Sequence, residues 1–255
     1  MRAASAHPGF ECSKARSSVE KAICTDPKLA ALDAALSWLW SNLKHTPALN
    51  AAQKNWLSTR ATCARTDRKI SSGDIFEEFL RPEEFASPVD PDGCIGVAYV
   101  RRIKELAPQS SLAAVRSGTY TTDPPLDLPQ GKASALAQIY LSARGYRQDE
   151  IFVENWGGGA GKIAGEGIWA NGHMCGFESS EKDTRRTGSR VQIFEDGSDR
   201  DEKYSVSFVV TPQVAIWVGG ARRFQCGARG GWSIAYFRQP DRLFSAVAKP
   251  AQETR

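Results

Sequence analysis

Histidine and methionine are scarce in this chain, with three His and two Met among 255 residues. The six cysteines include no Cys-x-x-Cys pair, so their spacing does not suit zinc, and we expect no metal and no cofactor. No apolar run approaches the roughly 18 residues that a membrane-spanning helix requires. The mean hydropathy is −0.40. The sequence therefore predicts no transmembrane segment.

An excess of charge of one sign is also lacking. Lys and Arg number 33 against 29 Asp and Glu, which gives a net charge of +4 and an isoelectric point of about 8.7. So small an excess of cations predicts no nucleic-acid partner. Aromatic surface is abundant, because 7 Trp, 11 Phe and 6 Tyr can bury a large apolar area. That content excludes a disordered chain.

The cysteines are even in number, at Cys12, Cys24, Cys63, Cys94, Cys175 and Cys226. Without metal-binding spacing, such a set predicts three disulfides in an oxidising compartment; the alternative is six reduced, buried cysteines. Ala4-Ser5-Ala6 has the small-x-small form of a signal-peptidase site, which makes about His7 the first mature residue. No hydrophobic segment precedes it, so we expect the signal peptide to be absent from this sequence. The predicted location is periplasmic or secreted.

Residues 8–112 have the pattern of a helical domain. A short helix over 19–24 is predicted, with Ser17 or Ser18 as its cap. Pro27 then suits the first turn of a second helix, which carries an apolar stripe at Leu29, Leu32, Leu36, Leu39 and Leu43. Two further helices are expected. One covers 48–63, with Leu49, Ala52, Trp56 and Leu57 at helical spacing; the other covers 94–106, with Ile95, Tyr99, Ile103 and Leu106 on one face. Between them lies a polar loop with room for a short helix at 74–80.

Residues 116–240 have the pattern of a β domain, and residues 241–255 that of a flexible tail. The strand at Gly118 opens the region, and further strands are predicted at 135–141, 150–155, 163–170, 190–195, 203–210, 214–218 and 231–237. Val206, Phe208 and Val210 predict a half-buried strand. Residues 132–143 are alternatively a helix, because they are rich in Ala and Leu. The expected class is α+β, with a disulfide-braced helical domain followed by a small antiparallel β barrel or sandwich.

Four groups of residues follow one another through the helical region. The first two are Cys12, Ala15, Glu20, Ile23 and Cys24, and then Leu29, Leu32, Asp33 and Leu36 with Trp40 behind them. The last two are Gln53, Trp56, Leu57, Arg60 and Cys63, and then Cys94, Ile95, Tyr99, Arg102, Ile103 and Leu106. Over residues 10–107 this order resembles the N-terminal domain of the lysozyme inhibitor LprI family. The chain differs in its Trp40, where the family has Tyr, and in its longer segment between Cys63 and Cys94.

The β region looks, more loosely, like the C-terminal domain of some of these proteins, through Gly172, Cys175, Asp196-Gly197, Cys226-Gly227, Gly230, Tyr236 and Arg238. The resemblance implies a periplasmic or cell-surface protein that blocks lysozyme. We expect bridges Cys12–Cys24 and Cys63–Cys94, with Cys175–Cys226 in the β domain. The connectivity 12–63 with 24–94 is an open alternative.

Basic residues supply the first candidate binding positions, which are Arg185, Arg186, Arg222, Arg223 and Arg229. An inhibitor that fills a glycosidase cleft must satisfy two catalytic carboxylates, and arginine does so well. The alternative is a solvated basic rim. Ser117 and Tyr120 are further candidates, because Ser117-Gly118-Thr119-Tyr120 looks like a fragment of the c-type lysozyme inhibitors that have a small β-barrel; packing at a strand start also explains it.

No catalytic set is predicted. His173 beside Cys175 is read as a turn histidine near a disulfide, and Glu154 with Glu166 as two solvated carboxylates rather than a glycosidase pair. Residues 157–162 lack the ending of a phosphate loop. Gln53, Trp56 and Arg60 share a helical stripe, which is interpreted as fastening neighbouring helices, with Arg60 paired to Asp33 or Glu20, rather than as a recognition surface.

These observations predict a non-enzymatic protein. We expect an inhibitor of lysozyme-type peptidoglycan hydrolases that blocks the active-site cleft, its partner being a lysozyme or a related muramidase. The alternative is a non-catalytic envelope binding module for glycan or protein partners.

Overall fold

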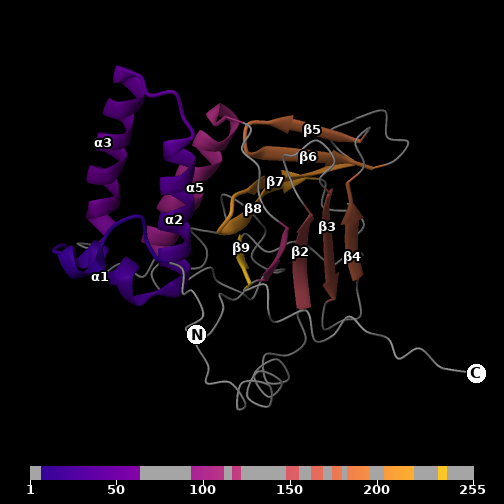
Figure 1. The fold of residues 1–255 in the computed structure, drawn as a ribbon, viewed down its shortest axis with the longest axis horizontal. Helices are drawn as coiled ribbons and strands as arrows, with labels where there is room; N and C mark the ends of the chain where they lie inside the picture. The colour runs from indigo at the N-terminus through magenta and orange to yellow at the C-terminus, as the bar shows by residue number, and fades with distance from the viewer. Residues whose placement is uncertain are drawn as a thin grey trace, which may run out of the picture.

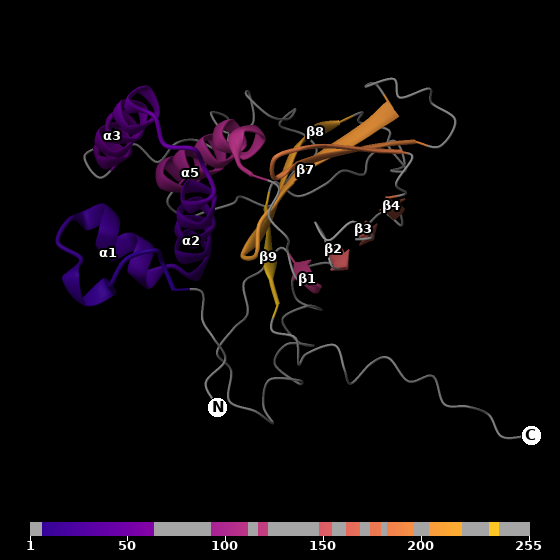
Figure 2. The ribbon, with the colours of Figure 1, turned by 45° about the horizontal axis from the view of Figure 1, so that its top comes forward.

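The computed structural model describes residues 7–63, 93–111, 117–121, 148–154, 162–168, 174–179, 183–195, 204–220 and 235–239. Within these ranges the helices come first and the strands follow, so the predicted α+β class is confirmed (Figure 1). The strands form one antiparallel sheet in the order β4-β3-β2-β1-β9-β8-β7-β6-β5. The sheet curls into a half-barrel, and the helices lie against its convex side at the bend (Figure 2).

The helical elements are η1 (Cys12–Lys14), α1 (Ser18–Thr25), α2 (Pro27–Ser41), α3 (Pro47–Thr62), α5 (Gly93–Leu106) and η3 (Ala107–Gln109). Ser17 caps α1, and Glu20 completes a capping box by bonding back to the Ser17 amide. The Asp26 side chain accepts from the amides of Lys28 and Leu29 at the start of α2. Polar caps followed by proline at the first position therefore define where α2 and α3 begin.

The strands are β1 (Gly118–Thr121), β2 (Gln148–Glu154), β3 (Lys162–Ile168), β4 (Met174–Glu178), β5 (Thr184–Thr187), β6 (Arg190–Phe194), β7 (Ser205–Val210), β8 (Val214–Gly220) and β9 (Ala235–Arg238). Six of the predicted strands correspond to β2, β3, β6, β7, β8 and β9, and the strand expected at Gly118 is β1. The segments predicted at 135–141, 132–143 and 74–80 lie outside the described residues. No strand was predicted at β4 or β5.

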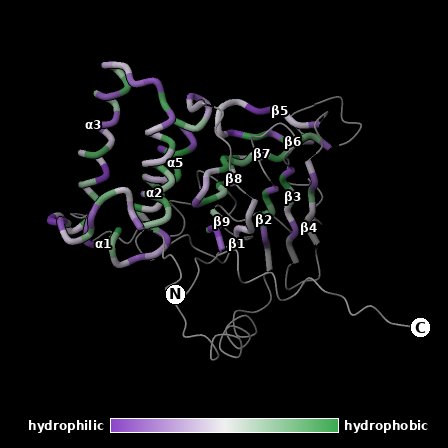
Figure 3. Tube along the Cα trace, in the orientation of Figure 1, coloured by the Kyte–Doolittle hydropathy of each residue, from purple (hydrophilic) through white to green (hydrophobic). Residues whose placement is uncertain are grey.

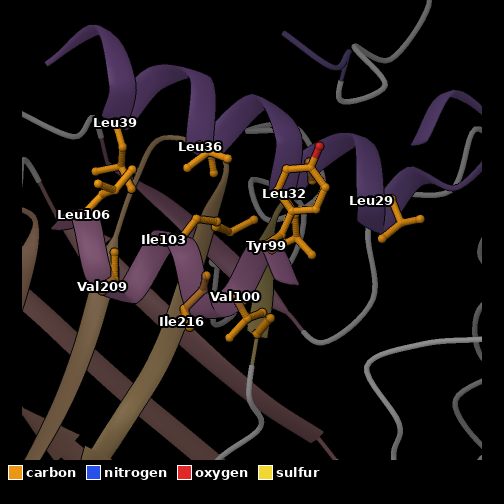
Figure 4. Packing of buried hydrophobic residues seen from close by; sticks show 14 of the residues in the cluster. Leu29, Leu32, Leu36, Leu39, Tyr99, Val100, Ile103, Leu106, Val209 and Ile216 are labelled. Carbon is orange, nitrogen blue, oxygen red and sulfur yellow. The ribbon is translucent and has the colours of Figure 1, made fainter. Parts of the chain in front are cut away.

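The predicted leucine stripe of α2 is buried along its whole length. It packs on α5, whose predicted face of Ile95, Tyr99, Ile103 and Leu106 is also buried. The opposite side of α5 faces the sheet, where Val209 and Ile216 join the same cluster (Figure 4). Helix α5 lies between α2 and the strands in this region, α2 also contacts β8 directly, and helices and sheet share one hydrophobic core.

A second cluster fills the concave side of the sheet. Successive residues of β8 alternate between the two clusters, because Val214 and Ile216 face the helices while Ala215 faces the concave side. The concave cluster is rich in aromatic rings; Phe177 stacks on Phe208 at a centroid distance of 5.2 Å, and the Tyr236 ring lies 6.4 Å from Phe208. Hydrophobic residues therefore line both faces of the central strands. Figure 3 shows the hydrophobic colouring concentrated along β7 and β8.

One burial prediction was wrong. Strand β7 is not half-buried, since all six of its residues are buried. The alternation of its residues predicts one face exposed to solvent, but Val209 on that face packs in the hydrophobic cluster that β7 shares with the helices. Helix α3 has no fully buried residue, and Leu57 of its predicted stripe is 41% exposed. Leu49 and Trp56 do pack against the core, so only part of that stripe faces inward.

Two of the expected disulfides are confirmed, Cys12–Cys24 and Cys63–Cys94, and the alternative connectivity is wrong. None of the four cysteines whose side chains the structure describes is free. The Cys175–Cys226 bridge stays a prediction, because Cys226 and the side chain of Cys175 lie outside the described part. The loop predicted between Cys63 and Cys94 lies outside it too.

Candidate functional site

The β5–β6 hairpin positions the candidate site. Thr187 pairs with Arg190 across the turn, and Arg185 pairs with Gln192 two residues further along the strands. Residues that pair across antiparallel strands lie on the same face, so these four polar side chains share one side of the hairpin. Strand β5 is the last strand of the described sheet, which leaves this face at the molecule's edge (Figure 1).

The hairpin turn is held against the C-terminal end of α5. Gly188 has a φ of +58°, a conformation that glycine adopts without strain. The Ser189 amide donates to the Ala107 carbonyl at 2.9 Å, and the hydroxyls of Ser110 and Ser189 are 2.8 Å apart. A Cβ on Gly188 would lie 2.2 Å from the Ala107 oxygen. The close approach fixes the hairpin on η3 and leaves its polar face pre-organised.

A cavity of about 210 Å³ opens between η3 and this face; we call it the hairpin cavity. Its described lining consists of Pro108, Arg185, Thr187, Arg190 and Gln192. Arg185 and Thr187 are exposed, whereas Arg190 and Gln192 are half-buried. The Gln192 amide donates to the Ser205 hydroxyl at 2.9 Å, which orients its side chain. No described lining residue is acidic.

Positive charge accumulates at the hairpin cavity. Burial, and secondly the neighbouring charge of Arg190, lower the pKa of the Lys104 ammonium to about 8. The Arg185 guanidinium lies 5.1 Å from the Phe194 ring centroid, a cation–π contact that steadies an exposed side chain. Two guanidinium groups, a hydroxyl and an amide around a small hollow suit an oxygen-rich anion.

Arg186 lies on the other face of β5, since it pairs with Val191, a residue of the concave cluster. Burial lowers the pKa of its guanidinium. The structure thus separates Arg185 from Arg186, although the two are adjacent in sequence. Arg222, Arg223 and Arg229 lie outside the described residues.

The Ser117–Tyr120 fragment does not form an accessible surface around Tyr120. The Tyr120 side chain is fully buried, and its hydroxyl donates to the Thr211 carbonyl at 2.8 Å. Ser117 is exposed, and its carbonyl accepts from the Arg238 guanidinium at 2.6 Å. Packing explains this fragment, because Gly118 lets Arg238 cross the strand: a Cβ there would lie 2.8 Å from the guanidinium.

The register also places the two carboxylates considered for catalysis. Glu154 pairs with Lys162 and Glu166 with Glu150, so Glu154 and Glu166 are four residues apart along neighbouring strands. At about 3.3 Å per residue this is roughly 13 Å, wider than the roughly 5 to 9.5 Å between glycosidase carboxyl groups. His173 and residues 157–161 lie outside the described part.

A buried polar cluster joins α2, α3 and α5. The Tyr99 hydroxyl donates to Asp33 at 2.5 Å and accepts from Arg60, and Arg60 lies 3.8 Å from Asp33. Burial first, and then the Asp33 charge, raises the pKa of Tyr99 well above its usual value, so it stays protonated. The second Asp33 oxygen accepts from the Gly9 amide at 2.7 Å, which ties the N-terminal segment to α2.

Trp56 and Gln53 complete the attachment of α3. The Trp56 indole donates to the Ala98 carbonyl at 3.2 Å, and Arg102 donates to Gln53 at 3.0 Å. The interpretation that this stripe fastens helices, with Arg60 paired to Asp33, is therefore confirmed. Polar contacts and the Cys63–Cys94 bridge hold α3 where apolar burial is small.

Sequence reasoning missed Pro108, Thr187, Arg190 and Gln192. The signal was Gly188-Ser189, a two-residue turn with glycine first. When the two strands pair on either side of that turn, residue 185 lies opposite residue 192 and residue 187 lies opposite residue 190. The contact with η3 carried no local signal, since it joins residues 79 apart in sequence.

No protein-family model, curated protein or solved structure matches this chain. The fold and site define a disulfide-braced α+β protein with a polar, basic face on an edge hairpin. Among the described residues, no helix has the length and apolar character to cross a bilayer, and no group of three His, Cys, Asp or Glu residues could hold a metal ion.

Proposed function

We propose that this protein is a secreted or periplasmic inhibitor of lysozyme-type peptidoglycan hydrolases, which it blocks by inserting the β5–β6 hairpin into the active-site cleft. The observation that carries the proposal is the pair of guanidinium groups, Arg185 and Arg190, on one face of a hairpin fixed to η3. A muramidase cleft contains two carboxylates, and arginine can pair with each in a charge-assisted hydrogen bond.

The rigidity of the hairpin supports this role. A loop that enters a cleft loses little conformational freedom when it is already held in its bound shape. Here Ser189 and Ser110 hold the turn on η3, and Phe194 contacts the exposed Arg185 side chain. Disulfides favour an oxidising location. The resemblance of residues 10–107 to the LprI family supports the same class of target.

The net charge indicates which class of muramidase is the more favourable target. With a charge of +4, this protein gains no long-range attraction toward a strongly basic lysozyme. Association with a neutral or acidic muramidase is favoured instead, and added salt should slow it.

The test is a lysis assay with purified full-length protein and muramidases of the c, g and i types. We expect submicromolar inhibition of at least one enzyme, with the strongest effect on the least basic. Arg185→Glu should weaken inhibition at least tenfold, because a carboxylate then opposes the target's carboxylates. Lys54→Gln removes an exposed cation on α3, across α2 and α5 from the hairpin, and should leave inhibition unchanged (Figure 1). Unaltered lysis across the whole panel would rule the proposal out.

A further inference from the structure

The hairpin cavity is small for an organic ligand site. Its volume is about 210 Å³, whereas pockets for drug-sized ligands are roughly 300 to 1,000 Å³. A space of this size suits one monosaccharide. The described lining side chains carry two guanidinium groups, a hydroxyl and an amide. The guanidinium groups can donate to an acidic group of a ligand, and the hydroxyl and the amide can hydrogen-bond to the hydroxyls of the ligand.

The charges around the cavity favour an anionic occupant. Arg190 is half-buried. Burial partly desolvates the Lys104 ammonium and lowers its pKa, and the charge of Arg190 also lowers that pKa. Two neighbouring cations in a partly dry setting repel each other, and a bound carboxylate relieves that repulsion. The exposed Arg185 stands at the other end of the same face.

The neutral groups favour a sugar over a bare anion. Thr187 lies opposite Arg190 and two residues from Arg185 on the same face, diagonal to Gln192. The Gln192 side chain is oriented by its bond to Ser205, and Pro108 adds an apolar surface from η3. A sugar ring presents hydroxyls to such amide and hydroxyl groups and its C–H face to an apolar one.

We infer that the hairpin cavity binds a carboxylate-bearing monosaccharide, its carboxylate held by Arg190 and Arg185 and its hydroxyls by Thr187 and Gln192. This goes beyond the proposed function, because a sugar can occupy the cavity whether or not the protein inhibits a hydrolase. Muramic and uronic acids share the required chemistry, a carboxylate attached to a pyranose.

Isothermal titration of the full-length protein with matched sugars tests the inference. N-acetylmuramic acid differs from N-acetylglucosamine by a lactyl carboxylate, and glucuronic acid differs from glucose by one carboxylate. At least one acid should bind at least tenfold more tightly than its neutral partner, and which acid does so identifies the source. Equal binding within both pairs, no binding of either acid, or equally tight binding of acetate or inorganic phosphate would overturn the inference.

Variants locate the site. Arg190→Gln and, separately, the exposed Arg185→Gln should each weaken binding of the acid about tenfold, as expected for loss of one charge-assisted hydrogen bond. Arg186→Gln removes the same charge from the opposite face of β5 and should leave binding unchanged. If Arg186→Gln weakens binding as much as Arg185→Gln does, the sugar binds elsewhere. Because the titration contains no hydrolase, its failure is distinguishable from a failure of inhibition.

Discussion

Single residues around the hairpin cavity differ in how well water solvates their charge. Arg185 is exposed, whereas Lys104 of α5 is half-buried and lies close enough to Arg190 to interact with its charge. Burial and Arg190 together make protonation of Lys104 costly in the folded state. A charge kept at such a position lowers stability, which is common where binding rather than folding sets the residue type.

Lys104→Met should therefore stabilise the protein at pH 7. The pKa of this ammonium is 10.5 ordinarily and about 8 in the folded protein, so the folded state holds the proton more weakly than the unfolded chain does. Its cost is complete below pH 8 and shrinks as the pH rises from 8 to 10.5, where the folded protein has released the proton. We expect a gain of about 1 to 2 kcal/mol at pH 7 that is mostly lost at pH 10.

Urea unfolding at the two pH values measures this difference. Lys54→Met, at an exposed position of α3, is the control and should change stability little at either pH. A gain from Lys104→Met that is equal at pH 7 and pH 10 would contradict the assigned cause, since apolar packing alone does not depend on pH.

Among the elements, the β5–β6 hairpin depends most on one position. Gly188→Ala should destabilise the protein by about 2 kcal/mol or more, because alanine is strained at positive φ and its Cβ would collide with the Ala107 carbonyl. Relieving the collision moves the turn off η3, so binding at the hairpin cavity should weaken as well. Thermal unfolding and the sugar titration measure the two effects.

Gly219→Ala is the matched control for that substitution. A Cβ on Gly219 in β8 meets no atom within 4 Å, and its φ is not positive. It should leave stability within about 1 kcal/mol of the parent and leave binding unchanged. A Gly188→Ala protein as stable as the Gly219→Ala protein would show that the turn is not held as the structure describes.

The sequence predicted those elements whose signals are local. Repeated leucines and a capped proline define α2, and Ser17 with Glu20 defines the start of α1. Strand β5 has the sequence Thr-Arg-Arg-Thr, with no apolar residue to show alternation. Charged residues on an edge strand also prevent pairing with other chains, so the composition of β5 is typical of an edge strand. The same composition gives no sequence pattern from which a strand could be predicted.

Other features depend on contacts between distant segments. The second buried face of β7 exists because α5 lies across it, which no window of sequence around Val209 reveals. The hairpin cavity likewise needs Pro108 from η3 and Arg185 from β5. Local patterns therefore predicted most helices and strands, whereas the site follows from how a helix end meets a turn.

On the scale of the whole molecule, the helical and β parts are joined by a common core. The cluster that contains Leu36 and Ile103 also contains Val209, Ile216 and Phe237 from three strands. The Cys12–Cys24 and Cys63–Cys94 bridges brace the helical side, and each restrains the unfolded chain by roughly 3 to 4 kcal/mol. A shared core predicts that neither part unfolds alone.

Ile216→Ala tests this coupling from the strand side. Ile216 is fully buried beneath α5, so its truncation should cost about 2 to 5 kcal/mol (Figure 4). The ellipticity at 222 nm, which reports the helices, and the hydrogen exchange of the β8 amides should shift together in a single transition. Leu57→Ala, which truncates a side chain that is 41% exposed, should cost less than about 1 kcal/mol. If the helices of Ile216→Ala persist after the sheet has unfolded, the two parts are independent domains and the cavity between η3 and the hairpin is a contact between them.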